Sequence, residues 1–351
     1  MTVVTTETIG CDLGDKTTAI CCLNQDGKTV LDVKTTRAGM REFFKRPPAL
    51  VVMEVGTHSR WVSEEAEKAG HEVVVANPRR LKLISQSDSK NDAADAELLA
   101  RLGRADIQLL SPIKHRGTQA QADLAVARVR DTLVSARTML VTQARGLVKS
   151  FGERLPSCEA ECFHRKAKDH VPELLQPALA PVFLALDAIE KAIKAEDHTL
   201  QVLAKKYPDM ELISQPNGVG LLTAMVFLLT LEDKARFKKS RDAGAFIGLR
   251  PRQDQSGDSN KQLPITKTGD PFLRRLLVIS ANYMLGPFGQ DSDLRRWGLE
   301  LAKRGGKNAK KRAKVAVARK LAVLMHRLWV TGETYQALGY VRKTSGVAAT
   351  N

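Results

Sequence analysis

The chain has 351 residues, of which 43% are hydrophobic and 27% are charged, an ordinary composition for a globular protein. A chain of this length is expected to form two or three domains. No stretch approaches ~18 uninterrupted apolar residues, which excludes a membrane span, and the first residues lack the features of a secretory signal. Five cysteines, with Cys21 and Cys22 adjacent, indicate free thiols in a reducing cytosol.

The charge balance points to an anionic partner. Lys and Arg number 55 against 39 Asp and Glu, which gives a net charge of +16 and a pI near 9.7. The stretch Lys303–Lys320 contains nine basic residues and no acidic one. A compact protein with this excess repels itself, and nucleic acid is the partner that most often neutralises it. Because aromatic residues are only 5%, we expect phosphate contacts more than base stacking.

Residues 7–110 are expected to form an α/β domain. In chain order the patterns predict three strands, a helix, a strand, a helix and a strand, at residues 7–13, 17–23, 28–36, 38–45, 50–53, 60–69 and 73–75. The apolar run Leu50–Met53 indicates a central strand buried on both faces, and Gly70 is a typical helix C-cap. A meander followed by alternating units predicts a mixed sheet with helices on its faces.

The rest of the chain is expected to be mainly helical. Apolar or small residues recur with heptad spacing in two series, at 126, 129, 133, 136, 140 and 147 and at 179, 182, 186, 189, 193, 200 and 203. They predict that residues 115–206 form an antiparallel coiled-coil hairpin, or more simply a helical core. Between the series, Cys158, Cys162 and His164 could ligate zinc, but a fourth ligand at a usual spacing is missing. Residues 210–340 contain an apolar helix at 221–231 and a basic helix at 310–329.

Four acidic residues form the first candidate site. Asp12 and Glu54 each end an apolar strand, where a carboxylate is costly unless it lies in a cleft or binds a cation. Asp92 and Asp95 are three residues apart and share one face of a predicted helix. Four carboxylates converging at one sheet edge would hold two divalent cations, Mg²⁺ or Mn²⁺, an arrangement suited to reactions at phosphorus. Taken alone, each of the four acids could equally be a helix cap or a salt-bridge partner.

A hydroxyl forms the second candidate site. Ser256 precedes Gly257 in the segment 248–257, which we predict to be a loop. Ser256 could be a nucleophile toward phosphate, with Arg250 and Arg252 pairing with that phosphate, although a Ser-Gly pair is more often a simple turn. Ser259 is a second serine close to Gly257, and we assign it no role.

Two further segments are candidates for nucleic-acid binding. Gly218 and Gly220 open a helix and offer backbone N–H groups to a phosphate. Four basic residues of the last helix could follow a phosphate backbone, or could be a solvated helix face: Lys310, Lys311, Lys314 and Arg319.

These motifs together resemble the DEDD transposases of bacterial insertion sequences, the IS110 family, which are bridge-RNA-guided serine recombinases. The resemblance spans about residues 7–340 and rests on motifs in the family's order: Gly10-x-Asp12-x-Gly14, Glu54, Asn91-Asp92-Ala93-x-Asp95-Ala96, Pro216-x-Gly218-Val219-Gly220, Phe246-x-Gly248-Leu249-x-Pro251 and Ser256-Gly257. The sequence departs from the family pattern at Asp254, an acid two residues before the serine.

The resemblance implies a RuvC-like (RNase H-fold) domain at residues 7–110, a coiled-coil region at 115–206 that mediates assembly, and a C-terminal transposase domain at 210–340. It implies that Asp12, Glu54, Asp92 and Asp95 bind Mg²⁺, while Ser256 forms a transient phosphoserine link to DNA. It also implies a site shared between protomers of a dimer or tetramer, with donor DNA, target DNA and a non-coding bridge RNA as partners. The location would be the bacterial cytoplasm, at the nucleoid.

Three other functions stay open at this point. A Holliday-junction nuclease would use only the acids and hydrolyse DNA with water. An actin-like or sugar-kinase-like ATPase would use Gly10–Thr18 as a phosphate loop, but a second such loop is missing and the C-terminal half is basic. A module that binds nucleic acid without cutting it would have no catalytic residues.

Overall fold

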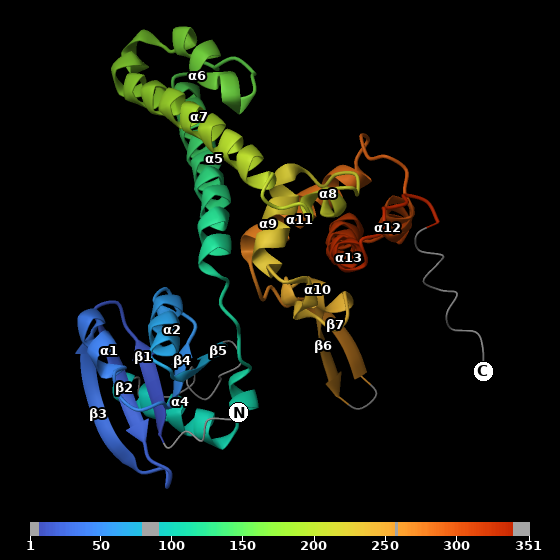
Figure 1. The fold of residues 1–351 in the computed structure, drawn as a ribbon. Coiled ribbons are helices and arrows are strands. Elements are labelled where there is room, and N and C mark those ends of the chain that lie inside the picture. The colour runs from blue at the N-terminus through green and yellow to red at the C-terminus, as the bar shows by residue number, and fades with distance from the viewer. Residues whose placement is uncertain (1–6, 79–90, 257–258, 340–351) are drawn as a thin grey trace, which may run out of the picture. The chain divides into compact units, whose positions relative to one another are not determined.

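The computed structural model describes residues 7–78, 91–256 and 259–339 (Figure 1). The chain divides into two compact units, Met1–His115 and Arg116–Asn351. Within the described residues, no helix combines the length and the apolar character that crossing a membrane requires.

A five-stranded mixed sheet forms the centre of the first unit. Its strands are β1 (Thr8–Leu13), β2 (Thr17–Leu23), β3 (Thr29–Thr36), β4 (Leu50–Glu54) and β5 (Glu72–Ala76), in the order β3-β2-β1-β4-β5. β1 pairs antiparallel with β2 and parallel with β4. The predicted mixed sheet is confirmed, and the first and fourth strands are neighbours as expected. The finer RuvC-like assignment stays a prediction.

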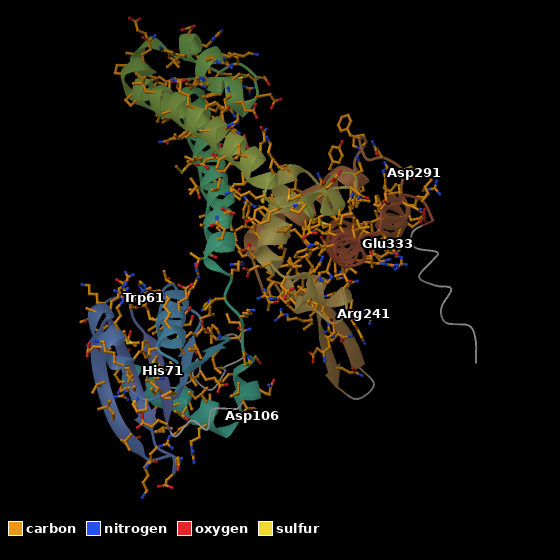
Figure 2. All side chains as sticks on the ribbon, viewed as in Figure 1. Trp61, His71, Asp106, Arg241, Asp291 and Glu333 are labelled. Atoms are coloured by element: carbon orange, nitrogen blue, oxygen red, sulfur yellow. The ribbon has the colours of Figure 1, made fainter. Side chains whose placement is uncertain are left out.

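Helices cover both faces of this sheet because the strand residues alternate in direction. On one face, Ile9 and Cys11 of β1 pack with residues of α1 (Arg37–Phe43) and α2 (Ser59–Lys68). The Arg37 guanidinium lies 4.6 Å from the centre of the Trp61 ring, which links α1 to α2 (Figure 2). On the other face, α4 (Asp92–Ala105) covers β1, β2 and β4 and leads into a short 3-10 turn at Ile107–Leu110.

Two glycines allow α4 to approach the sheet closely. A Cβ atom on Gly10 would lie 1.9 Å from the Ala96 carbonyl oxygen, and one on Gly103 would lie 2.4 Å from a methyl group of Val52. The helix backbone therefore rests directly on β1. This contact places the first turn of α4, with Asp92 and Asp95, over the end of β1.

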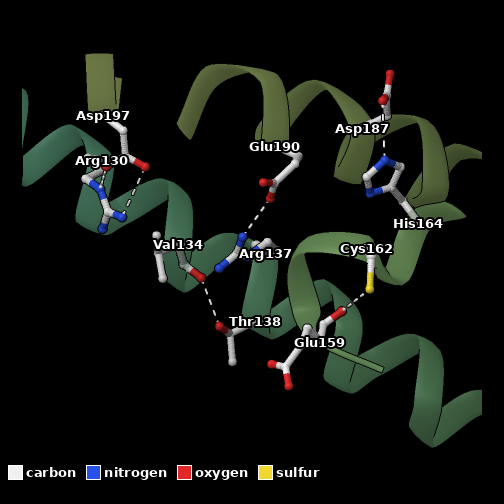
Figure 3. Close-up of polar contacts among 10 residues, drawn as sticks. All are labelled: Arg130, Val134, Arg137, Thr138, Glu159, Cys162, His164, Asp187, Glu190 and Asp197. Atoms are coloured by element: carbon white, nitrogen blue, oxygen red, sulfur yellow. Dashed lines mark hydrogen bonds and ion pairs between the residues drawn. The ribbon is translucent and has the colours of Figure 1, made fainter. Parts of the chain in front are cut away.

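The second unit begins with two long helices. α5 (Thr118–Ser150) packs along α7 (Gln176–Ala204), and ion pairs join Arg130 to Asp197 and Arg137 to Glu190 (Figure 3). Residue numbers rise along α5 as those of their partners fall along α7, so the two helices are antiparallel. The predicted helical hairpin is confirmed. Short turns connect its arms, at Ala160–Cys162, Phe163–Lys166 (α6), Lys168–His170 and Glu173–Leu175.

The predicted apolar seam is right for α7 and partly wrong for α5. Five of the predicted α7 positions are buried, at 179, 186, 193, 200 and 203, whereas Val129 and Leu147 of α5 are exposed. The α5 interface instead follows two heptad series, at 120, 127, 134, 141 and 148 and at 123, 130, 137 and 144. Charged residues occupy three positions of the second series, Asp123, Arg130 and Arg137, and each has a partner across the interface. A search for apolar residues therefore misses the second of these two series.

The remaining helices enclose the largest apolar core. They are α8 (Met210–Ile213), α9 (Leu221–Leu231), α10 (Arg241–Phe246), α11 (Pro271–Leu285), α12 (Asp293–Lys303) and α13 (Ala309–Thr331), with a 3-10 turn at Lys234–Arg236. α9 is buried almost throughout and packs with the apolar faces of α11 and α13. The mainly helical character of this region is confirmed.

The prediction of a loop at residues 248–257 holds for 248–250 and is wrong for 251–256, while Gly257 lies outside the described residues. β6 (Pro251–Ser256) pairs antiparallel with β7 (Ser259–Ile265). At the base of the hairpin the chain segments touch, since a Cβ atom on Gly248 would lie 2.1 Å from the Thr268 carbonyl oxygen. β6 residues 252–255 are polar and exposed, so the sequence lacks the apolar alternation that usually indicates a strand.

We expect Gly10→Ala to destabilise the first unit by about 1–3 kcal/mol, the usual cost of overpacking, because α4 has to move away from β1. Hydrogen exchange of peptides from β1 and α4, measured as a function of urea, reports this change. Gly56→Ala is the control, because its new Cβ would meet nothing within 4 Å. Equal protection of β1 and α4 in the two variants would contradict the proposed close packing.

Candidate active site

The ends of β1 and β4 carry two acids side by side. The parallel register pairs Gly10 with Val52 and Cys11 with Met53, so Asp12 and Glu54 follow as neighbours. Both lie on the sheet face that α4 covers, because they are two residues beyond Gly10 and Val52. Both side chains are half-buried.

The first turn of α4 adds two more acids. The Asn91 side chain caps this helix by accepting a hydrogen bond from the Ala93 N–H at 3.1 Å. Asp92 and Asp95 therefore lie at the positive end of the helix dipole, where carboxylates are favourable. Asp95 is half-buried, whereas Asp92 is exposed and pairs with the Lys34 ammonium at 2.8 Å. The four predicted acids thus come from three elements that meet at one sheet edge.

These carboxylates repel one another. Burial raises the pKa of Asp12 above its ordinary value, and the charges of Asp92 and Asp95 raise it further. Burial also raises the pKa of Glu54, as do the charges of Asp12 and Asp95. The hydrogen bond that Lys34 donates to Asp92 lowers the pKa of that carboxyl. The edge therefore holds more negative charge than Lys34 alone compensates.

The acidic edge fits a hard divalent cation in charge and in donor type, since all its donors are carboxylate oxygens. In the part of the chain that the structure describes, however, no three His, Cys, Asp or Glu side chains surround one point closely enough to hold a metal ion. Coordination would thus require the side chains of Asp12, Glu54 and Asp95 to turn toward one another. Asp92 would also have to leave Lys34.

Sequence reasoning missed Lys34. The strand registers place Lys34 opposite Ala19 and Ala19 opposite Asp12, so the three form one row across β3, β2 and β1. The small side chain of Ala19 leaves room for the lysine to reach the acidic edge from β3. Aligning the predicted hairpin residue by residue would have revealed this row, but no motif marks it.

Ser256 is the last residue of β6, opposite Ser259 in the hairpin register, and it belongs to the second unit. Asp254, the departure from the family pattern, lies opposite Lys261. The expectation that Arg250 lies beside Ser256 is wrong within one chain. Ser256 is six residue steps from Arg250 along an extended segment, which is about 20 Å at ~3.3 Å per residue, and Arg252 is about 13 Å away by the same measure.

The candidate nucleic-acid residues take different positions in the second unit. Gly218 has φ +87° and lies against the Ser280 carbonyl oxygen of α11. The left-handed backbone and this close contact are sufficient to explain a glycine at position 218 without phosphate binding. Gly220 is exposed at the N-terminus of α9. Lys310 and Lys311 are exposed in the first turn of α13, which contains no acidic residue, while Lys314 and Arg319 are half-buried.

The residues considered for zinc each have another partner. The Cys162 thiol donates to the Glu159 carbonyl oxygen at 3.3 Å, and the His164 ring lies 3.5 Å from Asp187 (Figure 3). Cys158 lies 3.8 Å from a nitrogen of Arg145. All five cysteines are free thiols.

Comparisons with known proteins identify the family. A family model for DEDD transposases of the IS110 type, described as "Transposase", matches residues 9–152. A second, described as "Transposase IS116/IS110/IS902 family", matches residues 210–288. The first match contains all four acids, and the second contains Ser256.

Curated relatives agree with these matches. The chain is 31% identical to the "Transposase for insertion sequence element IS1328" of Yersinia enterocolitica, over 82% of this chain and 87% of the relative. It is 28% identical to the "Transposase for insertion sequence element IS1111A" of Coxiella burnetii, over 93% and 91%. A "Putative transposase y4pF/y4sB" of Sinorhizobium fredii is 29% identical over 93% and 85%. The chain therefore belongs to the IS110 family of transposases.

Proposed function

We propose that this transposase cleaves and rejoins DNA through a phosphoserine intermediate on Ser256, with the acidic edge as its metal centre. The observation that carries the proposal is the convergence of Asp12, Glu54 and Asp95 from β1, β4 and α4 at one edge, with pKa values of Asp12 and Glu54 raised by burial and by mutual repulsion. Carboxylates in such a position are suited to binding a cation and to exchanging protons.

Asp12, Glu54 and Asp95 would hold the divalent cations, and Asp92 would join them on release from Lys34. A bound Mg²⁺ or Mn²⁺ would stabilise charge on the attacking and leaving oxygens at phosphorus. Lys34 limits the repulsion within the acidic edge when Asp92 is ionised, because it donates a hydrogen bond to that carboxylate.

Ser256 would supply the attacking oxygen. Its Oγ forms a bond to phosphorus while the bond from phosphorus to a deoxyribose oxygen breaks, the serine proton passes to a base, and the leaving oxygen takes up a proton. Attack by a second DNA hydroxyl on the phosphoserine reverses these changes and releases Ser256. The number of phosphoester bonds is conserved, so no ATP is required.

The partners in this proposal are donor DNA, target DNA and a bridge RNA that selects them, with the protein acting as a dimer or tetramer in the bacterial cytoplasm, at the nucleoid. The basic residues of α13 support nucleic acid as the ligand, since Lys310 and Lys311 are exposed and no acid lies in their helical turn. The acids and Ser256 belong to different units, which is compatible with a site shared between protomers. The competing function is a metal-dependent junction nuclease that uses water.

Asp12→Asn and Asp95→Asn should each reduce DNA cleavage by more than about a hundredfold, beyond the loss typical of residues that only support a metal site. Binding of DNA and RNA should change little, because the basic surface is intact. Cleavage of a labelled duplex in Mg²⁺, with an electrophoretic binding assay in parallel, measures both. Asp15→Asn is the control, since Asp15 is 93% exposed and lies three residues after Asp12. Full cleavage by Asp12→Asn would remove this residue from the site.

Ser256→Ala should abolish both strand exchange and the covalent protein–DNA adduct, because no other oxygen replaces Oγ. Ser259→Ala, its cross-strand neighbour, should retain both. A denaturing gel detects the adduct, and sequencing of the product junctions detects exchange. Continued cutting and joining by Ser256→Ala would contradict the serine mechanism and leave the metal-dependent nuclease in its place.

A further inference from the structure

A cavity of about 630 Å³ lies in the second unit, where α10 and α13 pack together. Five basic residues line it, from α10, from the position before β6 and from α13: Arg241, Arg250, Arg319, Lys320 and Arg327. Two acids, Asp242 and Asp293, also line it, and the Asp293 carboxylate already accepts a hydrogen bond from the Gly339 N–H at 2.7 Å. The cavity therefore has an excess of positive charge.

Most of these cations lack an acidic partner. Among residues 7–78, 91–256 and 259–339, no hydrogen-bond or ion-pair partner occurs for the guanidinium groups of Arg241, Arg250 and Arg319. Lys320 lies 3.9 Å from the centre of the Trp297 ring, and burial together with the Arg319 charge lowers its pKa. Positive groups gathered around one hollow repel one another, and an anion entering it relieves that repulsion.

The cavity also has an apolar wall, formed by Ala245, Leu294, Val323, Leu324 and Ala337, with Tyr335 beside it. Along α13, Arg319, Val323 and Arg327 are four residues apart, so one helix face alternates basic and apolar groups. The volume falls within the range of about 300–1,000 Å³ typical of small-molecule sites. A free phosphate gains nothing from contact with an apolar wall. A nucleotide carries a base as well as a phosphate, and the base can pack against that wall.

We propose that this cavity binds one unpaired nucleotide of a DNA or RNA strand. Its phosphate would lie against Arg241, Arg250 and Arg319, and its base would lie against the wall around Val323 and Leu294. Arg241 lies on α10 above the β6–β7 hairpin (Figure 2). A paired base in a duplex is stacked inside the helix and cannot enter, whereas loops and single strands present their bases.

The proposal rests on the proposed function, since it takes the nucleic-acid strands of that reaction as its ligand. The cavity is separate from the reacting centre. Arg250 directly precedes β6 and Ser256 is its last residue, so the two are about 20 Å apart at ~3.3 Å per residue. The nucleotide held here would therefore be several positions from the phosphate that Ser256 attacks.

Arg241→Gln combined with Arg250→Gln tests the site in the full-length chain, because both side chains are exposed and their loss leaves the core intact. The probes are single-stranded DNA and RNA of about 10 nucleotides, within the usual site size, and duplex DNA of the same length. Fluorescence anisotropy over a salt series gives Kd and its salt dependence. Single-strand Kd should rise about tenfold, with the salt slope smaller by about 1.4 at ~0.7 per lost contact, and duplex Kd should change less than about twofold.

Two control variants distinguish binding in the cavity from general electrostatic attraction of nucleic acid to the basic surface. Lys310→Gln combined with Lys311→Gln removes the same charge from exposed positions of α13 outside the cavity, and it should weaken single-strand and duplex binding alike. Ala245→Phe fills the cavity without changing charge, and it should weaken only single-strand binding. The strand type, DNA or RNA, whose binding the double arginine variant weakens more identifies the source of the nucleotide.

Unchanged single-strand binding by the double arginine variant would overturn the proposal, as would equal weakening of duplex binding. None of these measurements requires Ser256 chemistry. Failure of the serine mechanism would show as strand exchange by Ser256→Ala, so the two outcomes are distinguishable.

Discussion

The direct packing of α4 on β1 is the contact on which the acidic edge depends. A helix normally rests on a sheet through its side chains, but Gly10 and Gly103 remove that spacing, and the α4 backbone approaches the strands. The first turn of the helix consequently reaches the end of β1, where burial and then the charges of neighbouring acids raise the pKa of Asp12 and of Glu54. The segment Gly10-x-Asp12 thus places a residue needed for close packing and an acid of the proposed metal centre on the same sheet face.

Charge has a different role in each part of the molecule. At the acidic edge, like charges are gathered and only partly compensated by Lys34. In the α5–α7 hairpin, opposite charges are paired, and the Arg137–Glu190 ion pair is almost fully buried. Breaking a buried pair leaves an uncompensated charge, so such pairs favour a single register of the two helices. Around α13 most basic side chains have no ion-pair partner within the described part of the chain, which is typical of a surface that contacts phosphates.

The local sequence pattern was sufficient to predict a helix or strand wherever apolar residues define that element. The strands of the first unit, the apolar helix α9 and the basic helix α13 were predicted within about two residues, as was the adjacency of Asp12 and Glu54, which follows from strand order. Polar elements were missed. Residues 252–255 of β6 are polar and show no apolar alternation, and one series of the α5 interface places Asp123, Arg130 and Arg137 where apolar residues are expected. Lys34 was missed because its relation to Asp12 appears only after three strands are aligned.

Titration of the 351-residue chain with Mn²⁺ shows whether the acidic edge binds a divalent cation. Electron paramagnetic resonance counts free Mn²⁺ during a titration, and competition with Mg²⁺ identifies the sites they share. We expect the unmodified chain to bind Mn²⁺, Asp12→Asn and Asp95→Asn each to lose this binding, and Asp15→Asn to retain it. Mn²⁺ binding by Asp12→Asn equal to that of the unmodified chain would contradict the claim.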